Sequence, residues 1–292
     1  MMFFVNRLIS ATAVLLLVSL AAFILMRIVP GDPARLVMGP LASEEAVQGL
    51  REEMGLDRPM FQQYARYLVG LLGGDWGTAW HTRQPVADII AMRLPASLEL
   101  AISALIIAIG IGIPIGAVAA LKCDAGFDRA TRAGSLVLLG TPPFWLGLVL
   151  ILLGFSWLGL APPPFERLTP GLGAPDGPTG FLLLDAILSG KLRILSDAAA
   201  HLVLPALTLG LPLAAWLALI TRRSVLDAYG AEYIKTARSK GVGEVSILFR
   251  HALPNALLPI LTLSTLAFGD LIAGSIMVET VFSWPAPSCS TS

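Results

Sequence analysis

The chain carries five long apolar runs that are separated by more polar segments. They lie at about residues 8–29, 96–121, 133–160, 201–220 and 253–278. Each run is long enough to cross a hydrocarbon core of about 30 Å as a helix that rises about 1.5 Å per residue. A helix satisfies its own backbone hydrogen bonds, which lipid cannot do. The pattern therefore predicts an all-α membrane protein, a polytopic helical bundle with five spans.

The distribution of Lys and Arg predicts which side of the membrane each polar segment occupies. Segment 221–251 is short and rich in Lys and Arg, so the positive-inside rule places it in the cytoplasm. Arg7 and Lys122 agree with this orientation, and the N-terminus is then also cytoplasmic. Segments 31–95 and 161–200 fall outside. Residues 1–285 form one transmembrane domain, and residues 286–292 form a tail.

The first outer segment carries helix signals of its own. Ser43 precedes Glu44 and Glu45, and Val47, Leu50 and Met54 follow at helical spacing, which predicts a capped amphipathic helix. Residues 61–72 predict a second such helix. We therefore expect the outer segment to be folded rather than a bare loop.

Composition narrows the classes of function. The chain is 55% hydrophobic and 14% charged, with a mean hydropathy of +0.77, and its net charge is zero. Lipid is therefore an expected partner, while nothing favours nucleic acid. Cys123 and Cys289 lie far apart, and the three histidines have no ligand spacing, so we expect no metal site. The sequence has no Walker A string, so we expect no cofactor and no ATP bound by this chain.

Three acidic residues fall in or near the apolar runs, where a charge is costly. They are Glu99, Asp270 and Glu279. One interpretation is that they line a translocation path and meet a charged solute. The alternative is that they are hydrogen-bonded packing groups between helices. Gly112 and Gly116 form a small-xxx-small pair, which favours close helix packing.

The most informative segment lies in the predicted cytoplasmic loop. It consists of Glu232, Tyr233, Ile234, Lys235, Thr236, Ala237, Arg238, Ser239, Lys240 and Gly241. This pattern predicts a short helix that ends at Gly241, because glycine suits the left-handed position after a helix. Pro254 then opens the next span near its first turn, where proline is tolerated. A short helix between two spans is able to pass a push from a cytoplasmic partner to the membrane. An ordinary basic loop that only fixes topology is the alternative.

This segment, with Leu253 and Pro254 after it, resembles the coupling loop of ABC importer permeases. The string Glu-Tyr-Ile-Lys-Thr-Ala-Arg-Ser-Lys-Gly is similar to loops of the dipeptide and oligopeptide branch, which also includes nickel and glutathione importers. Further motifs of this branch occur in order along the chain, at residues 29–33, 55–59, 74–77, 93–100, 143–145 and 278–282.

The resemblance implies a MetI-like fold and a non-catalytic permease subunit of an ATP-driven importer in the bacterial inner membrane. Such a permease pairs with a second, homologous permease. Two cytoplasmic ABC ATPases bind the coupling loops, and an extracytoplasmic binding protein delivers the solute. An ion-driven secondary transporter and an intramembrane protease are weaker alternatives, because the sequence has neither inverted repeats nor a catalytic pair in its spans.

The C-terminal residues depart from the family pattern. Family members continue after Trp-Pro into an outer segment and a sixth span, whereas here Trp284 and Pro285 precede an atypical tail at 286–292. We therefore expect a truncated permease that lacks the sixth span. The hypothesis that follows is impaired activity, because a helix seam would be left exposed to lipid.

Overall fold

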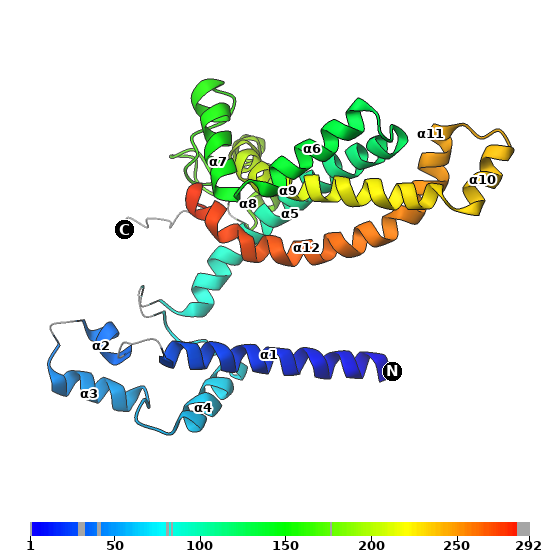
Figure 1. The fold of residues 1–292 in the computed structure, drawn as a ribbon. Coiled ribbons are helices and arrows are strands. Elements are labelled where there is room, and N and C mark those ends of the chain that lie inside the picture. Colours follow the sequence, from blue (N-terminus) through cyan, green and yellow to red (C-terminus); the bar gives the residue numbers. More distant parts are fainter. Residues whose placement is uncertain are drawn as a thin grey trace. The chain divides into compact units, whose positions relative to one another are not determined.

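The computed structural model describes residues 2–28, 33–39, 42–79, 82, 84–175 and 177–284. The predicted tail at 286–292 and most of the motif at 29–33 lie outside the described residues. The chain forms two compact units, Met1–Ala91 and Met92–Ser292 (Figure 1).

The described residues of the first unit form four helices and the start of a fifth. They are α1 (Met2–Ile28), α2 (Pro33–Met38), α3 (Glu44–Glu53), α4 (Met60–Leu72) and the beginning of α5. The predicted cap of α3 is present, since the backbone N–H of Ala46 donates to Ser43 Oγ at 3.3 Å. That bond satisfies one of the orphan donors of the first helical turn.

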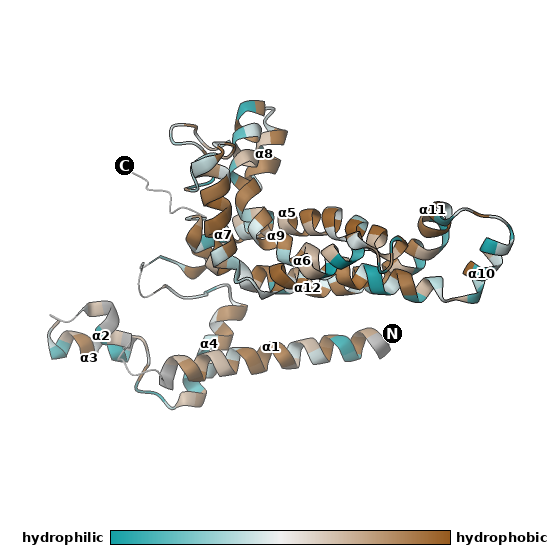
Figure 2. Cartoon of the chain, turned by 45° about the horizontal axis from the view of Figure 1, so that its top comes forward, coloured by the Kyte–Doolittle hydropathy of each residue, from teal (hydrophilic) through white to brown (hydrophobic). Residues whose placement is uncertain are grey.

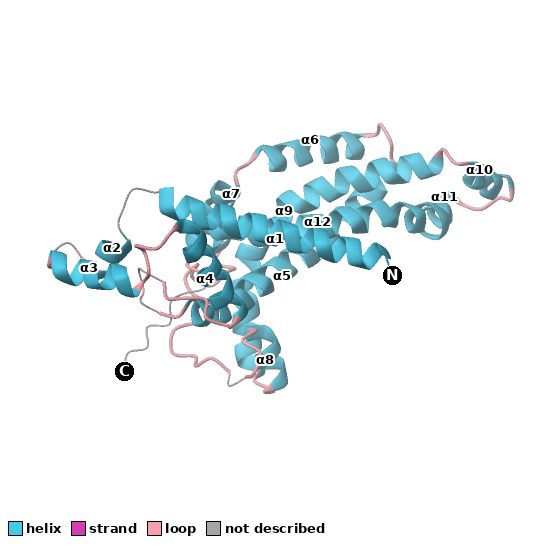
Figure 3. Cartoon of the chain, turned by 90° about the horizontal axis from the view of Figure 1, so that it is seen from below, coloured by secondary structure: helices cyan, strands magenta, loops and turns pink. Residues whose placement is uncertain are grey.

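The second unit is also helical. Its elements are most of α5 (Val86–Leu121), α6 (Gly126–Gly140), α7 (Pro143–Ile151), a π-helical turn (Leu152–Trp157), α8 (Leu182–Leu188), α9 (Leu192–Tyr229), α10 (Glu232–Ser239), α11 (Glu244–Ile247), a second π-helical turn (Leu248–Ala252) and α12 (Leu253–Val281). Figure 3 shows helices and loops but no strand in the described part of the chain. The β-structure there is one isolated bridge between Thr78 and Pro85. The prediction of an all-α fold is confirmed.

Among the described residues, four helical segments are long and apolar enough to cross a membrane. They are Phe4–Met26, Val86–Leu121, Leu192–Tyr229 and Glu244–Val281. A fifth crossing results if α6 and α7 with its π-helical turn count as one span. The structure is thus consistent with the five predicted spans. The helices of the second and fourth crossings extend beyond the predicted runs, beginning at residues 86 and 192.

The third predicted span, at 133–160, is not one straight helix. The axes of α6 and α7 differ by 104° at the break between Gly140 and Pro143. Thr141 and Pro142 are both extended, with ψ of 123° and 136°. Two consecutive prolines remove two backbone donors, and each disfavours a helical conformation in the residue before it. The proline pair therefore ends one helix and starts another.

Helix α9 is the centre of the second unit. It contacts α6, α7, α8 and α12, and it approaches the backbone of α5 closely. A Cβ added at Gly112 would lie 2.6 Å from the carbonyl oxygen of Ala214, and one at Gly116 would lie 2.4 Å from that of Ala218. Figure 2 shows the apolar residues along α5, α9 and α12. In lipid such close contact holds helices together, because the hydrophobic effect does not drive them to associate.

We predict that Gly116→Ala destabilises the fold by about 1–3 kcal/mol, because its methyl group overlaps the backbone of α9. Gly110→Ala is the matched control, since a Cβ at Gly110 meets nothing within 4 Å. Thermal unfolding of both variants in detergent tests this prediction. Equal melting temperatures would show that α5 and α9 do not approach each other as described.

Candidate functional site: the α10–α11 loop

Residues 230–252 connect α9 to α12 and contain α10 and α11 (Figure 1). Helix α10 begins at Glu232 and ends at Ser239, and α11 begins at Glu244. The ten residues singled out from the sequence therefore form one helix and the turn that follows it.

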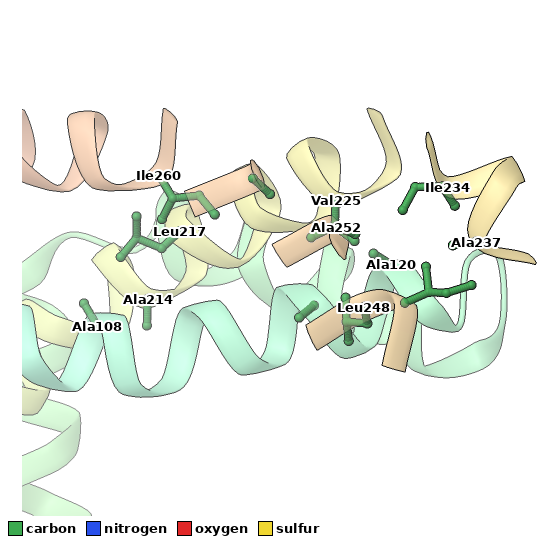
Figure 4. Packing of buried hydrophobic residues seen from close by; sticks show 13 residues of the cluster. Ala108, Ala120, Ala214, Leu217, Val225, Ile234, Ala237, Leu248, Ala252 and Ile260 are labelled. Carbon is green, nitrogen blue, oxygen red and sulfur yellow. The ribbon is translucent and has the colours of Figure 1, made fainter. Parts of the chain in front are cut away.

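One face of α10 is anchored in the core. Ile234 is fully buried, and Ala237 is 8% exposed. Both belong to a cluster of buried residues that includes Val225 of α9, Leu248 of the second π-helical turn and Ile260 of α12 (Figure 4). The cluster continues along α5 and α9 through Ala120 and Leu217. The buried face of α10 therefore packs directly on side chains of the spans.

The opposite face of α10 is free. Glu232, Lys235, Thr236 and Ser239 are exposed, and their spacing of three, four and seven residues places them on one side of the helix. The ammonium group of Lys235 lies 2.7 Å from Glu232 Oε1, so two of these charges pair with each other. Such exposed pairs contribute little to stability. This face of α10 is polar, and its side chains are not part of the buried core.

Gly241 sets the turn between α10 and α11. Its φ is +77°, in the left-handed region. Its N–H donates to the carbonyl of Arg238 at 2.9 Å, and the N–H of Val242 donates to the carbonyl of Ala237 at 3.2 Å. Glycine is favoured here because a Cβ is strained at this φ. The predicted C-terminal glycine of the short helix is confirmed.

Arg238 joins three elements around this turn. Its Nε and Nη2 donate to Glu244 Oε1 and Oε2 at 2.6 and 3.0 Å, and its guanidinium lies 5.4 Å from the ring centroid of Tyr229. The hydrogen bond that Arg238 donates to the carboxylate of Glu244 raises the pKa of Arg238. The pair ties the end of α10 to the start of α11, next to the last residue of α9. The roles of Glu244 and Tyr229 could not be predicted from the sequence, because contacts across a turn have no helical periodicity.

A buried ion pair lies near the C-terminal end of α9. Asp128 of α6 is fully buried, and its carboxylate accepts from Nε and Nη2 of Arg222. The backbone N–H of Asp124 also donates to Asp128 at 2.9 Å. Cys123 and Asp124 are close enough to Asp128 for a shared cation, but both Asp128 oxygens are already occupied by Arg222. The ion pair holds α6 against α9. The sequence indicated the charge of Arg222 but not its partner.

The three acidic residues considered for a translocation path occupy different surroundings. Glu99 is buried, forms an ion pair with Arg167 and accepts from the N–H of Leu183 at 2.7 Å. Glu279 is half-buried and accepts from Ser275 Oγ at 2.7 Å. Asp270 is exposed on α12. No hydrogen bond or ion pair joins any two of these three described residues.

Glu99 belongs to a network that holds the opposite end of the unit. Arg167 stacks on Trp284, with its guanidinium 5.1 Å from the ring centroid. Trp284 Nε1 donates to the carbonyl of Ala96 at 3.2 Å. The contacts of Glu99 thus join α5, the loop before α8, and the residues after α12. These contacts are those expected of a hydrogen-bonded group that packs between helices.

The fold defines a class of protein: a helical membrane protein that crosses the bilayer several times and presents a folded, partly free loop between two spans. Residues 112–289 match the family described as "Binding-protein-dependent transport system inner membrane component", and residues 1–101 match its N-terminal family. The chain belongs to this family. It is accordingly a non-catalytic permease subunit of an ABC importer.

Curated relatives are similar in sequence to this chain over most of its length. It is 41% identical to the probable D,D-dipeptide transport system permease protein DdpB of Escherichia coli (strain K12), over 92% of this chain and 78% of that protein. It is 39% identical to the dipeptide transport system permease protein DppB of the same strain, over 92% and 80%. It is 34% identical to the glutathione transport system permease protein GsiC of that strain, over 96% and 82%.

We predict that Glu99→Gln destabilises the protein by about 3–5 kcal/mol, because it leaves Arg167 without its buried charge partner. Glu166→Gln is the matched control, since Glu166 is the exposed neighbour of Arg167. Thermal unfolding of the two variants measures the difference. If both melt like wild type, Glu99 is not held by Arg167.

We predict that Gly241→Ser costs the loop about 1–2 kcal/mol, because the new Cβ is strained at φ +77°. The same change at Gly243 serves as the control. Gly243 precedes α11 with φ −67°, and serine is favoured at that capping position. Limited proteolysis of the 230–252 loop reports the outcome, with faster cleavage expected for Gly241→Ser alone. Equal cleavage of the two variants would contradict the assigned turn.

Proposed function

We propose that this permease forms half of the translocation path of an importer for peptides or a related small solute, and that α10 docks a cytoplasmic ATPase. The proposal is carried by one observation: α10 buries one face on the ends of the spans and leaves the other face free. The names of the relatives, which include dipeptide and glutathione permeases, support the solute class.

Docking on the free face would let the ATPase move the spans. A displacement of α10 acts on Val225 and Leu248 through Ile234 and Ala237. The Arg238–Glu244 pair keeps α10 and α11 together while they move. ATP is bound and hydrolysed by the partner, and this chain binds no cofactor.

The assembly would contain two homologous permeases, two ATPases and an extracytoplasmic solute-binding protein. The N-terminus and the 230–252 loop face the cytoplasm, as the positive charge of the loop favours. The binding protein then delivers solute on the opposite side, where the network of Glu99, Arg167 and Trp284 lies at the other end of α5.

Asp270 is the best candidate of the three acidic residues for the path. It lies well inside α12 and is exposed in the single chain. A carboxylate in hydrocarbon costs about 2.5–3.5 kcal/mol on insertion scales, so such groups face protein or water. Lining the path would give Asp270 water and a counter-charge, the amino terminus of a peptide. Glu279 lies near the C-terminal end of α12, which in this proposal is the end where the binding protein delivers the solute. The contacts of Glu99 favour a packing role.

The docking proposal predicts that Ser239→Trp abolishes recovery of the ATPase with the permease, because the bulky ring covers the free face of α10. Ser196→Trp is the matched control, since Ser196 is exposed near the other end of α9. The measurement is co-purification of the permease with its candidate ATPase and its sister permease from membranes.

Recovery of the sister permease with both variants serves as the folding control. If Ser239→Trp recovers as much ATPase as Ser196→Trp, α10 is not the docking helix. If wild-type permease recovers the sister permease but no ATPase, the assigned assembly is wrong.

A further inference from the structure

Helix α4 has three distinct sides. Tyr64, Tyr67, Leu68 and Leu71 share one side, at spacings of three, four and seven residues. Phe61, Ala65, Val69 and Leu72 share a second side. Gln62, Gln63 and Arg66 form the third. No residue of α4 is buried, so the helix does not belong to an internal core of its unit.

The tyrosine side of α4 lies on α1. The hydroxyl of Tyr64 lies 2.8 Å from Ser19 Oγ, and it donates to the carbonyl of Leu16 at 3.1 Å. The ring of Phe23 lies 5.4 Å from that of Tyr64 and 6.1 Å from that of Tyr67. Within Phe4–Met26, Ser19 and Phe23 are half-buried and the other side chains are exposed. Helix α4 is therefore what covers α1 at these two positions.

These contacts fix the depth of α4 relative to the first span. Ser19 precedes Met26 by seven residues, which is about 10 Å along a helix. The apolar segment of α1 ends at Met26, so Tyr64 meets α1 inside the stretch that is long and apolar enough to span the membrane. A helix that contacts this stretch from the side must lie within, or at the surface of, the membrane leaflet around the Met26 end of α1.

The second side of α4 is apolar and free. Phe61 and Val69 are each 70% exposed, and Leu72 is 90% exposed. The polar side is turned toward the chain that follows the charged helix α3, because Gln63 Nε2 donates to the carbonyls of Leu56 and Arg58 at 3.0 and 2.7 Å. An apolar side at membrane depth and a polar side next to charged chain are the features of an interfacial helix.

We infer that α4 is a membrane-surface helix whose Phe61–Val69–Leu72 side packs on phospholipid acyl chains in the leaflet around the Met26 end of α1. Gln62 and Arg66 then lie among the headgroups and water. The lipid contact anchors the segment between the first two spans to the bilayer instead of leaving it free in solution. This role is separate from ATPase docking and from the solute path.

Spin labelling tests the inference in the reconstituted full-length permease. Single cysteines replace Phe61, Leu72, Gln62 or Arg66 in a background with Cys123→Ser and Cys289→Ser, and each carries a nitroxide label. Accessibility to oxygen, which concentrates in lipid, is compared with accessibility to a water-soluble nickel chelate. We expect a several-fold higher oxygen-to-nickel ratio at Phe61 and Leu72 than at Gln62 and Arg66.

Two results would overturn the inference. Equal ratios at all four positions, dominated by the nickel chelate, would place α4 in water. Low accessibility to both reagents at Phe61 and Leu72 would show that protein covers this side, whether another part of this chain or a partner subunit. A label on Leu15, exposed in the middle of α1, provides the lipid reference within the same unit.

Discussion

The close backbone contact between α5 and α9 is the constraint on which the second unit depends. Lipid is as apolar as leucine, so burial of apolar side chains does not bring these two helices together. Glycines allow it instead: Gly112 and Gly116 let the backbone of α9 approach α5, and Gly210 does the same in the reverse direction against Ala104. With α5 and α9 held in this way, α6, α7, α8 and α12 pack around α9.

The contact between α5 and α9 also helps to fix the end of α9, on which the 230–252 loop packs. Arg222, about two turns before the end of α9, is held by the buried carboxylate of Asp128 on α6. Tyr229, at the last residue of α9, lies against Arg238. The loop therefore rests on a helix that is fixed along its length. The π-helical turn at Leu248–Ala252 is the less regular connection, and π-helical turns in helices are frequent at functional sites. A push on α10 is then expected to be taken up at the start of α12 more readily than by α9.

Sequence alone predicts the features that depend on neighbouring residues. Apolar run length indicated the spans, Ser43 indicated the cap of α3, and Gly241 indicated the turn after α10, because each follows from local helix chemistry. The ion pairs could not be predicted, because Glu99 and Arg167 are 68 residues apart and Asp128 and Arg222 are 94 apart. The bend at Pro142 depends on how the two prolines act together. Proline within a span is tolerated in some positions, so its presence alone did not indicate a break.

Some acidic residues of the spans find their counter-charge within the chain, and one does not. Asp128 and Glu99 are buried, and each has an arginine partner from another part of the same chain. Asp270 lies within a span, yet it is exposed, and no ion pair in the described residues holds it. A charge in a membrane needs water or a counter-charge. Since no described residue supplies a counter-charge to Asp270, water or a counter-charge must come from outside the chain, and the proposed path formed with a second permease would supply one of them.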